Sequence, residues 1–242
     1  MRTSCKLYFL LFVLCIIGIT SACTKKQISE DEKFLTYIVD AQSQDIAFYW
    51  KNDSGNIIRS IERLKTYVES RNKELVFAVN GGMYNKERAP QGLFIQNGKV
   101  VTPLDTTQGK GNFYMKPNGV FYITNDNEPI VCRTEDFKDN GQVKYATQSG
   151  PMLLDDGKMH PAFKEGSENL NIRNGVGIMA DGRVVFVMSK AEVNFYDFAS
   201  YFMSLGCKDA LYLDGYVSRT YLPGQDWIQI DGDFGVIIGV VK

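Results

Sequence analysis

The chain has 242 residues, of which 44% are hydrophobic and 12% aromatic, so it can bury a sizeable core and is neither disordered nor fibrous. Its 27 basic and 28 acidic residues give a formal net charge of −1. Because no run or stripe of Lys and Arg is present, nucleic acid is not an expected partner.

The N-terminus predicts export. An apolar run at residues 7–19 follows two basic residues and is too short to span a bilayer comfortably, which is typical of a signal peptide over residues 1–22. The small residues before Cys23 resemble a bacterial lipobox, which makes Cys23 the expected lipidation site and residues 23–33 a polar tether. Simple cleavage after Ala22 fits as well. We expect an exported protein, anchored to the periplasmic or outer face of the cell envelope through this lipid alone.

The first folded elements can be placed from their patterns. Alternating apolar residues predict a strand over 34–49, followed by a turn at 52–55. Apolar residues at helical spacing predict an amphipathic helix over 57–72 that covers a sheet face. The apolar run at 75–79 predicts a buried strand that stops at Asn80.

Four β-hairpins are predicted next, because one local pattern recurs as far as residue 190. A polar residue and a glycine precede an apolar strand, and an Asn- or Asp-containing turn leads to a second strand. The leading polar residues are Gln91, Asn118, Ser149 and Asn174. In one continuous sheet these four side chains would gather along one edge, and there we expect the functional site.

The last part of the chain predicts a helix and two strands. Asn194 is a good N-cap for a helix with an apolar stripe, and Gly206 marks its end. The strand that follows ends at Asp214, and a closing strand spans 234–241. The expected fold is a single α+β domain over 34–242, a hairpin-rich mixed sheet with at least two amphipathic helices packed on it.

Cysteine and histidine usage narrows the chemistry. Only Cys132 and Cys207 lie in the expected domain, and they could form a disulfide or remain buried thiols. His160 is the only histidine and no Cys-x-x-Cys motif occurs, so a His/Cys zinc site is close to excluded. A Ser-His-Asp triad would have to use His160, which lies in a turn-like segment.

Four short motifs occur in a meaningful order: Asn80-Gly81-Gly82, Ser149-Gly150-Pro151, Asn171-Ile172-Arg173-Asn174-Gly175 and Leu213-Asp214-Gly215. In this order the chain resembles the phosphodiester glycosidase family over roughly residues 75–240. One departure lies after Asp214-Gly215, where the family commonly carries more glycine and serine. Here Tyr216, Val217 and Arg219 surround Ser218. We therefore expect the family's chemistry with a different substrate.

The resemblance implies hydrolysis of the bond between a sugar's anomeric carbon and a phosphate, which yields free sugar and a phosphomonoester. Such a reaction needs a carboxylate near the anomeric carbon, a cation on the leaving phosphate and neutral donors on the sugar. We expect Asp214 to be the nucleophile or base. Arg173 is expected to clamp the phosphate, because a guanidinium matches phosphate bidentately.

Further residues are expected to bind sugar or phosphate oxygens. The polar side chains in this set are those of Asn80, Gln91, Ser149, Asn171 and Ser218, with Arg219 as a second candidate clamp. Backbone amides of glycines can approach an anion closely, and the candidates are Gly81, Gly82, Gly150 and Gly215. The expected partner is a phosphorylated carbohydrate or glycan.

Three other interpretations remain open at this stage. A non-catalytic glycan-binding surface lipoprotein would stack sugars on aromatic side chains, with candidates Trp50, Tyr84, Tyr216, Tyr221 and Trp227. A metal-dependent phosphodiesterase would break the P–O bond, but its usual Asp/His ligand cluster is not evident with one histidine. No cofactor is required by the motifs. A calcium or magnesium site with ligands from Asp209, Asp214 or Asp226 stays a candidate.

Overall fold

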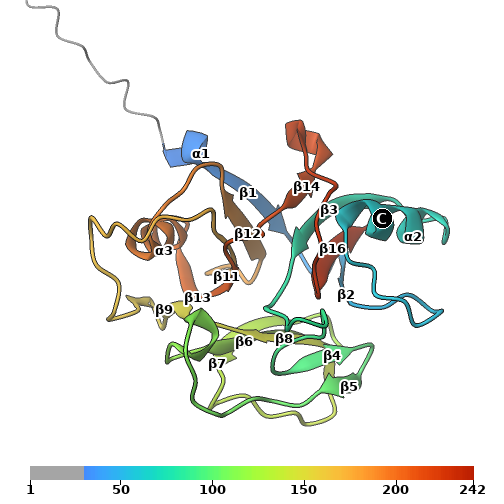
Figure 1. Cartoon of the computed structure of the whole chain (residues 1–242), viewed down its shortest axis with the longest axis horizontal. Coiled ribbons are helices and arrows are strands. Elements are labelled where there is room, and N and C mark those ends of the chain that lie inside the picture. The colour runs from blue at the N-terminus through green and yellow to red at the C-terminus, as the bar shows by residue number, and fades with distance from the viewer. Residues whose placement is uncertain (1–29) are drawn as a thin grey trace, which may run out of the picture.

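The computed structural model describes residues 30–242 (Figure 1). The predicted signal peptide, Cys23 and the tether up to residue 29 lie outside the described residues. Within residues 30–242, no helix is long and apolar enough to cross a membrane. Cys132 and Cys207 are both free thiols, so the predicted alternative of a disulfide between them is not formed.

The described chain is mostly β-structure, arranged in three sheets. The six-stranded sheet has the order β1 (Phe34–Val39), β12 (Val184–Ser189), β11 (Asn174–Met179), β13 (Cys207–Asp214), β9 (Met152–Asp155) and β10 (Lys158–Met159). A second sheet has the order β15 (Trp227–Ile228), β14 (Thr220–Leu222), β3 (Leu75–Asn80), β16 (Ile237–Val241) and β2 (Asp45–Tyr49).

The third sheet has the order β5 (Lys99–Thr102), β4 (Phe94–Gln96), β8 (Val143–Ser149), β6 (Gly119–Thr124) and β7 (Pro129–Arg133). The helices are α1 (Glu30–Lys33), α2 (Ile61–Glu69) and α3 (Phe195–Ser204), with 3₁₀ turns η1 (Asn112–Tyr114) and η2 (Pro223–Gln225). Figure 1 shows α3 beside the six-stranded sheet, α2 beside the second sheet, and the third sheet below both.

The four predicted hairpins are confirmed, but the single mixed sheet is wrong. Hairpins β4–β5 and β6–β7 belong to the third sheet, whereas β9–β10 and β11–β12 belong to the six-stranded sheet. Every strand pair among residues 30–242 is antiparallel. The turn chemistry therefore predicted local pairing correctly, while assignment to sheets depends on contacts between distant segments.

Two predicted element bounds change for local reasons. The strand expected over 34–49 is divided into β1 and β2, because a turn forms in which Asp40 accepts hydrogen bonds from the backbone N–H groups of Gln42 and Gln44. The helix expected over 57–72 begins only at Ile61, where the Ser60 side chain accepts a hydrogen bond from Arg63 N.

A cluster of phenylalanines joins the three sheets in one core. Phe186 of β12 lies 5.1 Å from Phe77 of β3 and 5.9 Å from Phe121 of β6, measured between ring centroids. Phe121 in turn lies 5.3 Å from Phe48 of β2. All four rings are buried, and such contacts between aromatic rings add to the free energy gained from burying their area. This core fixes the sheets relative to one another.

The two longer helices cover outer faces of two sheets. On α3, Phe198, Ala199 and Phe202 pack in a cluster with residues of β9, β12 and β13. On α2, the buried side chains are Ile61, Leu64 and Val68, and they pack with residues of β3 and β16. Because α3 supports β13 from behind, the end of that strand is held where the six-stranded and second sheets meet.

Candidate functional site

Asp214 ends β13, as the sequence predicts, and faces Asn174 at the start of β11. The pairing shifts register between Asn174 and Gly175, so Leu213 lies in a bulge just before Asp214. A bulge bends its strand locally and re-aims the next side chain. Asp214 N donates to Asn174 Oδ1 at 2.7 Å, which fixes the end of the strand.

The Asn174 side chain also joins this strand end to the second sheet. It is fully buried, and its Nδ2 donates to both Asn80 O and Asn80 Oδ1 at 2.9 Å. Asn80 ends β3, and its Nδ2 lies 3.4 Å from Asp214 Oδ2. Arg219 N donates to Asn80 Oδ1 at 2.9 Å. The three ends of β3, β11 and β13 therefore form one hydrogen-bonded group, which we call the amide cluster: Asn80, Asn174 and Asp214.

The electrostatics of Asp214 are unusual for a surface carboxylate. Burial raises the pKa of Asp214 to about 6, against the lowering effect of hydrogen bonds from Gly215 N and Asn80. Gly215 N donates to Asp214 Oδ1 at 2.6 Å. Among the described residues no Lys or Arg forms an ion pair with Asp214. The carboxyl can therefore exchange a proton near neutral pH.

Arg173 is a buried cation, with only 1% of its surface exposed. Its Nε donates to Val193 O and its Nη2 donates to Asn169 O, both at 2.8 Å. The guanidinium lies 3.6 Å from the ring centroid of Phe195, at the start of α3. Burial lowers the pKa of Arg173, and no carboxylate in residues 30–242 pairs with it. Arg173 is thus a buried positive charge that carbonyl oxygens and the Phe195 ring hold in place.

Tyr212 connects the two charged groups. Its ring centroid lies 5.6 Å from the Arg173 guanidinium. Burial is the main cause that raises the pKa of Tyr212; the charge of Asp214 raises it further, and the charge of Arg173 lowers it. Gly215 packs against the Tyr212 hydroxyl so closely that a Cβ there would overlap it. The phenol therefore lies between the predicted clamp and the turn that carries Asp214.

Two predicted sugar-binding hydroxyls hold the backbone around Asp214. The buried Ser149 Oγ donates to Leu213 O at 2.9 Å, and Ser218 Oγ lies 3.3 Å from Asp214 O. The guanidinium of Arg219, expected as a second clamp, pairs instead with Asp231 Oδ1 at 2.9 Å. Ser149, Ser218 and Arg219 therefore lie around the amide cluster, but each of these side chains already has a hydrogen-bond or ion-pair partner within the protein.

The predicted glycines mainly allow close packing of backbones. Gly81 N donates to Val236 O at 2.8 Å, so this amide already has a partner. A Cβ on Gly82 would overlap Thr147, and one on Gly150 would lie 2.6 Å from Asn118 Cβ. Gly82 meets Thr147 of β8, where the second and third sheets approach one another, whereas Gly150 packs against the residue that precedes β6 within the third sheet.

The two remaining predicted residues differ in their surroundings. Asn171 Nδ2 donates to Asn169 Oδ1 at 2.9 Å, and Asn169 holds Arg173 through its backbone and side-chain oxygens. Asn171 is thus next to the clamp. Gln91 donates its backbone N–H to Met83 O and makes no hydrogen bond to the amide cluster. The expectation that all four hairpin starts share one edge is wrong, because the hairpins belong to different sheets.

Sequence reasoning placed Asn174 among the four side chains expected at the edge of the site, but it assigned no catalytic or binding role to Asn174, Tyr212 or Asn169. Asn174 carried a usable signal, since it leads a hairpin and follows Arg173 directly. Tyr212 lies in an alternating strand and was assigned no role beyond it. Asn169 holds Arg173 through its backbone carbonyl oxygen, and a pattern of side chains in the sequence does not indicate such a contact.

The candidate cation ligands do not gather in the structure. Asp209 and Asp214 lie near opposite ends of β13, and Asp226 follows η2. Within residues 30–242, no group of three or more His, Cys, Asp or Glu side chains is placed to hold a metal ion. His160 Nε2 lies 2.9 Å from Lys116 O rather than near a serine hydroxyl, so a Ser-His-Asp triad through it is not formed.

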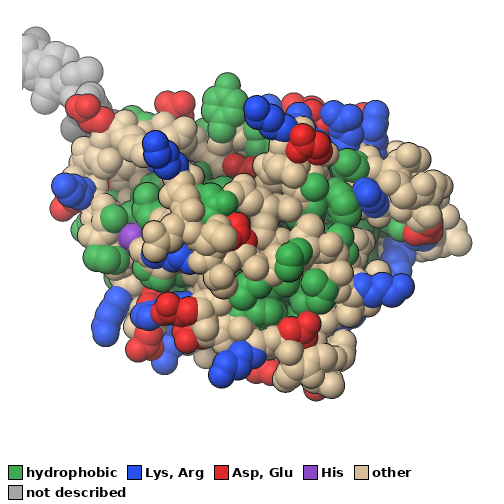
Figure 2. Space-filling view, turned by 60° about the horizontal axis from the view of Figure 1, so that its bottom comes forward, with side chains coloured by type: hydrophobic (Ala, Val, Ile, Leu, Met, Phe, Trp, Pro, Cys, Tyr) green, Lys and Arg blue, Asp and Glu red, His purple; other side chains and the backbone are tan. Residues whose placement is uncertain are grey.

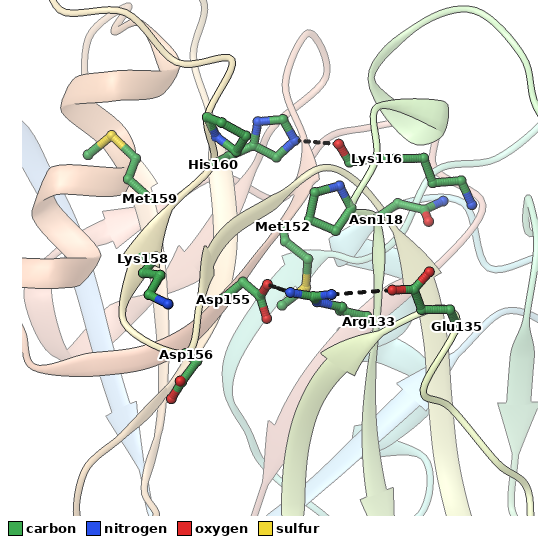
Figure 3. Close-up of a pocket in the computed structure, with 12 residues that line it drawn as sticks. Lys116, Asn118, Arg133, Glu135, Met152, Asp155, Asp156, Lys158, Met159 and His160 are labelled. Carbon is green, nitrogen blue, oxygen red and sulfur yellow. Dashed lines mark hydrogen bonds and ion pairs between the residues drawn. The ribbon is translucent and has the colours of Figure 1, made fainter.

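A cleft of about 810 Å³ lies away from the amide cluster, between the β9–β10 hairpin and β7 (Figure 3). Arg133 and Asp155 form an ion pair in it, and Met152 lines it, but none of the amide-cluster residues does. Acidic and basic side chains are interspersed on the face shown in Figure 2. Neither this cleft nor the distribution of surface charge marks the position of the amide cluster. It is recognised instead by the buried, hydrogen-bonded side chains of Asn80 and Asn174.

Comparison with known proteins adds the family. The sequence profile of the phosphodiester glycosidase family matches residues 73–234. Among curated proteins, the uncharacterised protein YigE of Escherichia coli (strain K12) is 38% identical over 189 residues, which are 78% of this chain and 74% of YigE. The profile spans Asn80, Arg173 and Asp214, and the resemblance seen in the motifs is confirmed.

Solved structures share the fold at low identity. The catalytic domain of zebrafish N-acetylglucosamine-1-phosphodiester alpha-N-acetylglucosaminidase, auto-inhibited by its pro-peptide, has a TM-score of 0.56 at 14% identity, covering 86% of this chain and 88% of that one. A putative exported protein from Burkholderia pseudomallei K96243 has a TM-score of 0.56 at 11% identity, covering 86% and 73%. Together with the profile and YigE, these findings show that the chain belongs to the phosphodiester glycosidase family.

Proposed function

We propose that this protein is an exported hydrolase that cleaves the glycosidic bond of a sugar-1-phosphodiester, giving a free sugar and a phosphomonoester. One observation carries the proposal. Tyr212 lies close to two groups: Arg173, a buried guanidinium without a carboxylate partner in the described chain, and Asp214, whose pKa is raised to about 6. This pair suits an anionic leaving group next to a reacting carbon.

The carboxylate of Asp214 would act at the anomeric carbon. As the C–O bond to phosphate breaks, the phosphomonoester leaves with the bonding electron pair, and positive charge develops on the sugar ring. Asp214 either attacks this carbon or removes a proton from the water that does. If Asp214 attacks, it forms a glycosyl ester, and water then displaces the carboxylate at the same carbon and releases its proton to solvent. If Asp214 acts as the base, it takes the proton of the attacking water and passes it to solvent. In both routes the free sugar gains its new oxygen from water.

Arg173 would stabilise the departing phosphate. In its buried environment a guanidinium interacts with an anion more strongly than it would in water, since the surrounding dielectric constant is lower. Its position is set before substrate arrives, through Val193 O, Asn169 O and the Phe195 ring. Little reorganisation is then needed as charge develops on the phosphate.

The comparisons support the reaction class more than the substrate. The zebrafish enzyme with this fold is named for N-acetylglucosamine-1-phosphodiesters, whereas YigE of Escherichia coli, the relative of higher identity, is uncharacterised. For this chain the sugar remains part of the proposal. Export and a lipid anchor at Cys23 are also proposed, on the basis of the N-terminal motif.

The direct test is hydrolysis of a panel of sugar-1-phosphodiesters in water labelled with ¹⁸O. We expect the label to appear in the released sugar, because the C–O bond on the sugar side breaks. Mass spectrometry of sugar and phosphomonoester gives the result. Label in the phosphate would instead indicate cleavage of the P–O bond and would overturn the proposed mechanism.

Replacing Asp214 by Asn should lower kcat at least about 100-fold, because the amide can neither accept a proton nor attack the ring carbon. The matched control is Asp181→Asn, which changes another Asp-Gly turn at the far end of the β11 strand. Sugar release measures activity, and circular dichroism checks folding. A folded Asp214→Asn protein with activity within a few-fold of wild type removes Asp214 from the mechanism.

The rate should depend on pH through Asp214. Burial raises its pKa to about 6, so the carboxyl is protonated and inactive below that pH and ionised above it. We therefore expect kcat/KM to rise with pH through about 6 and then to level off. Initial rates between pH 4 and 8 measure this profile. A rate that falls as pH rises through 6 would assign Asp214 the role of acid instead.

Arg173→Lys keeps the charge but loses the planar donor pair. We expect kcat/KM to fall about 10- to 100-fold, which corresponds to the loss of a hydrogen bond to a charged group. Arg219→Lys is the matched control, because Asp231 already holds the Arg219 guanidinium, and it should stay within about 3-fold. Equal effects of the two substitutions in folded proteins would contradict the assignment of Arg173 as the clamp.

A further inference from the structure

The turn that follows Asp214 is firmly held at both ends. Ser218 N donates to Gly215 O at 2.9 Å, which closes the turn over residues 215–218. The Ser218 side chain is buried, with its hydroxyl against Asp214 O. Arg219 N donates to Asn80 Oδ1, so the residue that follows the turn is hydrogen-bonded to the amide cluster. The turn therefore has one defined conformation next to the reactive carboxyl.

Tyr216 is the exception within this turn. Its surface is 93% exposed, whereas Gly215 and Ser218 are buried and Val217 packs against the core cluster that includes Tyr221 and Phe234. A tyrosine ring in water adds almost no burial energy to the fold. An aromatic side chain held in solvent on an anchored turn is available to a ligand at little conformational entropy cost, because it has only two rotatable side-chain bonds.

The position of the turn indicates which part of a ligand Tyr216 would meet. Gly215 packs against the Tyr212 hydroxyl and near Ile172 O, next to Arg173 in sequence. The Tyr212 ring in turn lies 5.6 Å from the Arg173 guanidinium. The turn thus adjoins the Arg173 side of Asp214. In the proposed binding mode, with the phosphate at Arg173, the group beyond the phosphate would lie next to this turn.

We propose that Tyr216 determines specificity by stacking on a ring in the group beyond the phosphate. The inference rests on the proposed function, since it takes the phosphate to bind at Arg173. It adds a substrate class: phosphodiesters whose second group carries an aromatic, heterocyclic or sugar ring. The flat face of tyrosine packs well on such rings and tolerates different chemical types.

The test compares two substrates with the same sugar and phosphate, one bearing a methyl group and the other a benzyl group. For Tyr216→Ala we expect kcat/KM to fall about 3- to 10-fold on the benzyl substrate and less than 2-fold on the methyl substrate. Tyr216→Phe keeps the ring and should match wild type on both. Val100→Ala, which shortens an exposed side chain on β5 in the third sheet, is the control for loss of surface apolar area.

The outcomes separate this inference from the proposed function. Hydrolysis of the methyl substrate by wild type tests the proposed function. Equal losses on both substrates, or no loss on either, overturn the role of Tyr216. If wild type cleaves neither substrate, calorimetric binding of benzyl phosphate and methyl phosphate to wild type and Tyr216→Ala decides. A preference for benzyl phosphate that disappears in Tyr216→Ala supports the inference, and an unchanged preference overturns it.

Discussion

The arrangement of the site depends on one buried amide, that of Asn174. A buried amide must satisfy both its oxygen and its nitrogen, and here the oxygen accepts from Asp214 N while the nitrogen donates to Asn80. These two partners belong to different sheets. The polar requirement of a single side chain therefore aligns the ends of β3, β11 and β13, and the phenylalanine core holds the sheets in the positions that this alignment needs.

The two charged groups of the proposed mechanism, Arg173 and Asp214, form no ion pair with each other. A direct ion pair between Arg173 and Asp214 would hold the pKa of the carboxyl low and would occupy the guanidinium. Tyr212 lies between them instead, and backbone carbonyls of Val193 and Asn169 satisfy Arg173 without cancelling its charge. Asp214 then responds to its own burial. Neither charge neutralises the other, which the proposed mechanism requires of its carboxylate and its guanidinium.

The sequence predicted local structure better than long-range structure. Asn-Gly and Asp-Gly turns gave three of the four hairpins, and the turn Asn125-Asp126-Asn127 gave the fourth. Asn194 gave the start of α3, and the alternating strand gave the position of Asp214. Division of the hairpins between sheets was not predictable, since it depends on packing between residues far apart in the chain. Similarly, the sequence shows that Ser149 has a hydroxyl that could bind a ligand. Only the fold shows that this hydroxyl is buried and donates to Leu213 O instead.

The link between β13 and β14 limits how this protein can change. Residues 215–219 connect Asp214, paired in the six-stranded sheet, to Thr220, which pairs with Val79 in the second sheet. Both ends are fixed by backbone pairing, so a shorter link would displace Asp214 or shift Thr220 out of register. The minimum length of the link is therefore set by the two sheets that it joins, whereas an exposed side chain such as Tyr216 can be exchanged without moving either strand end.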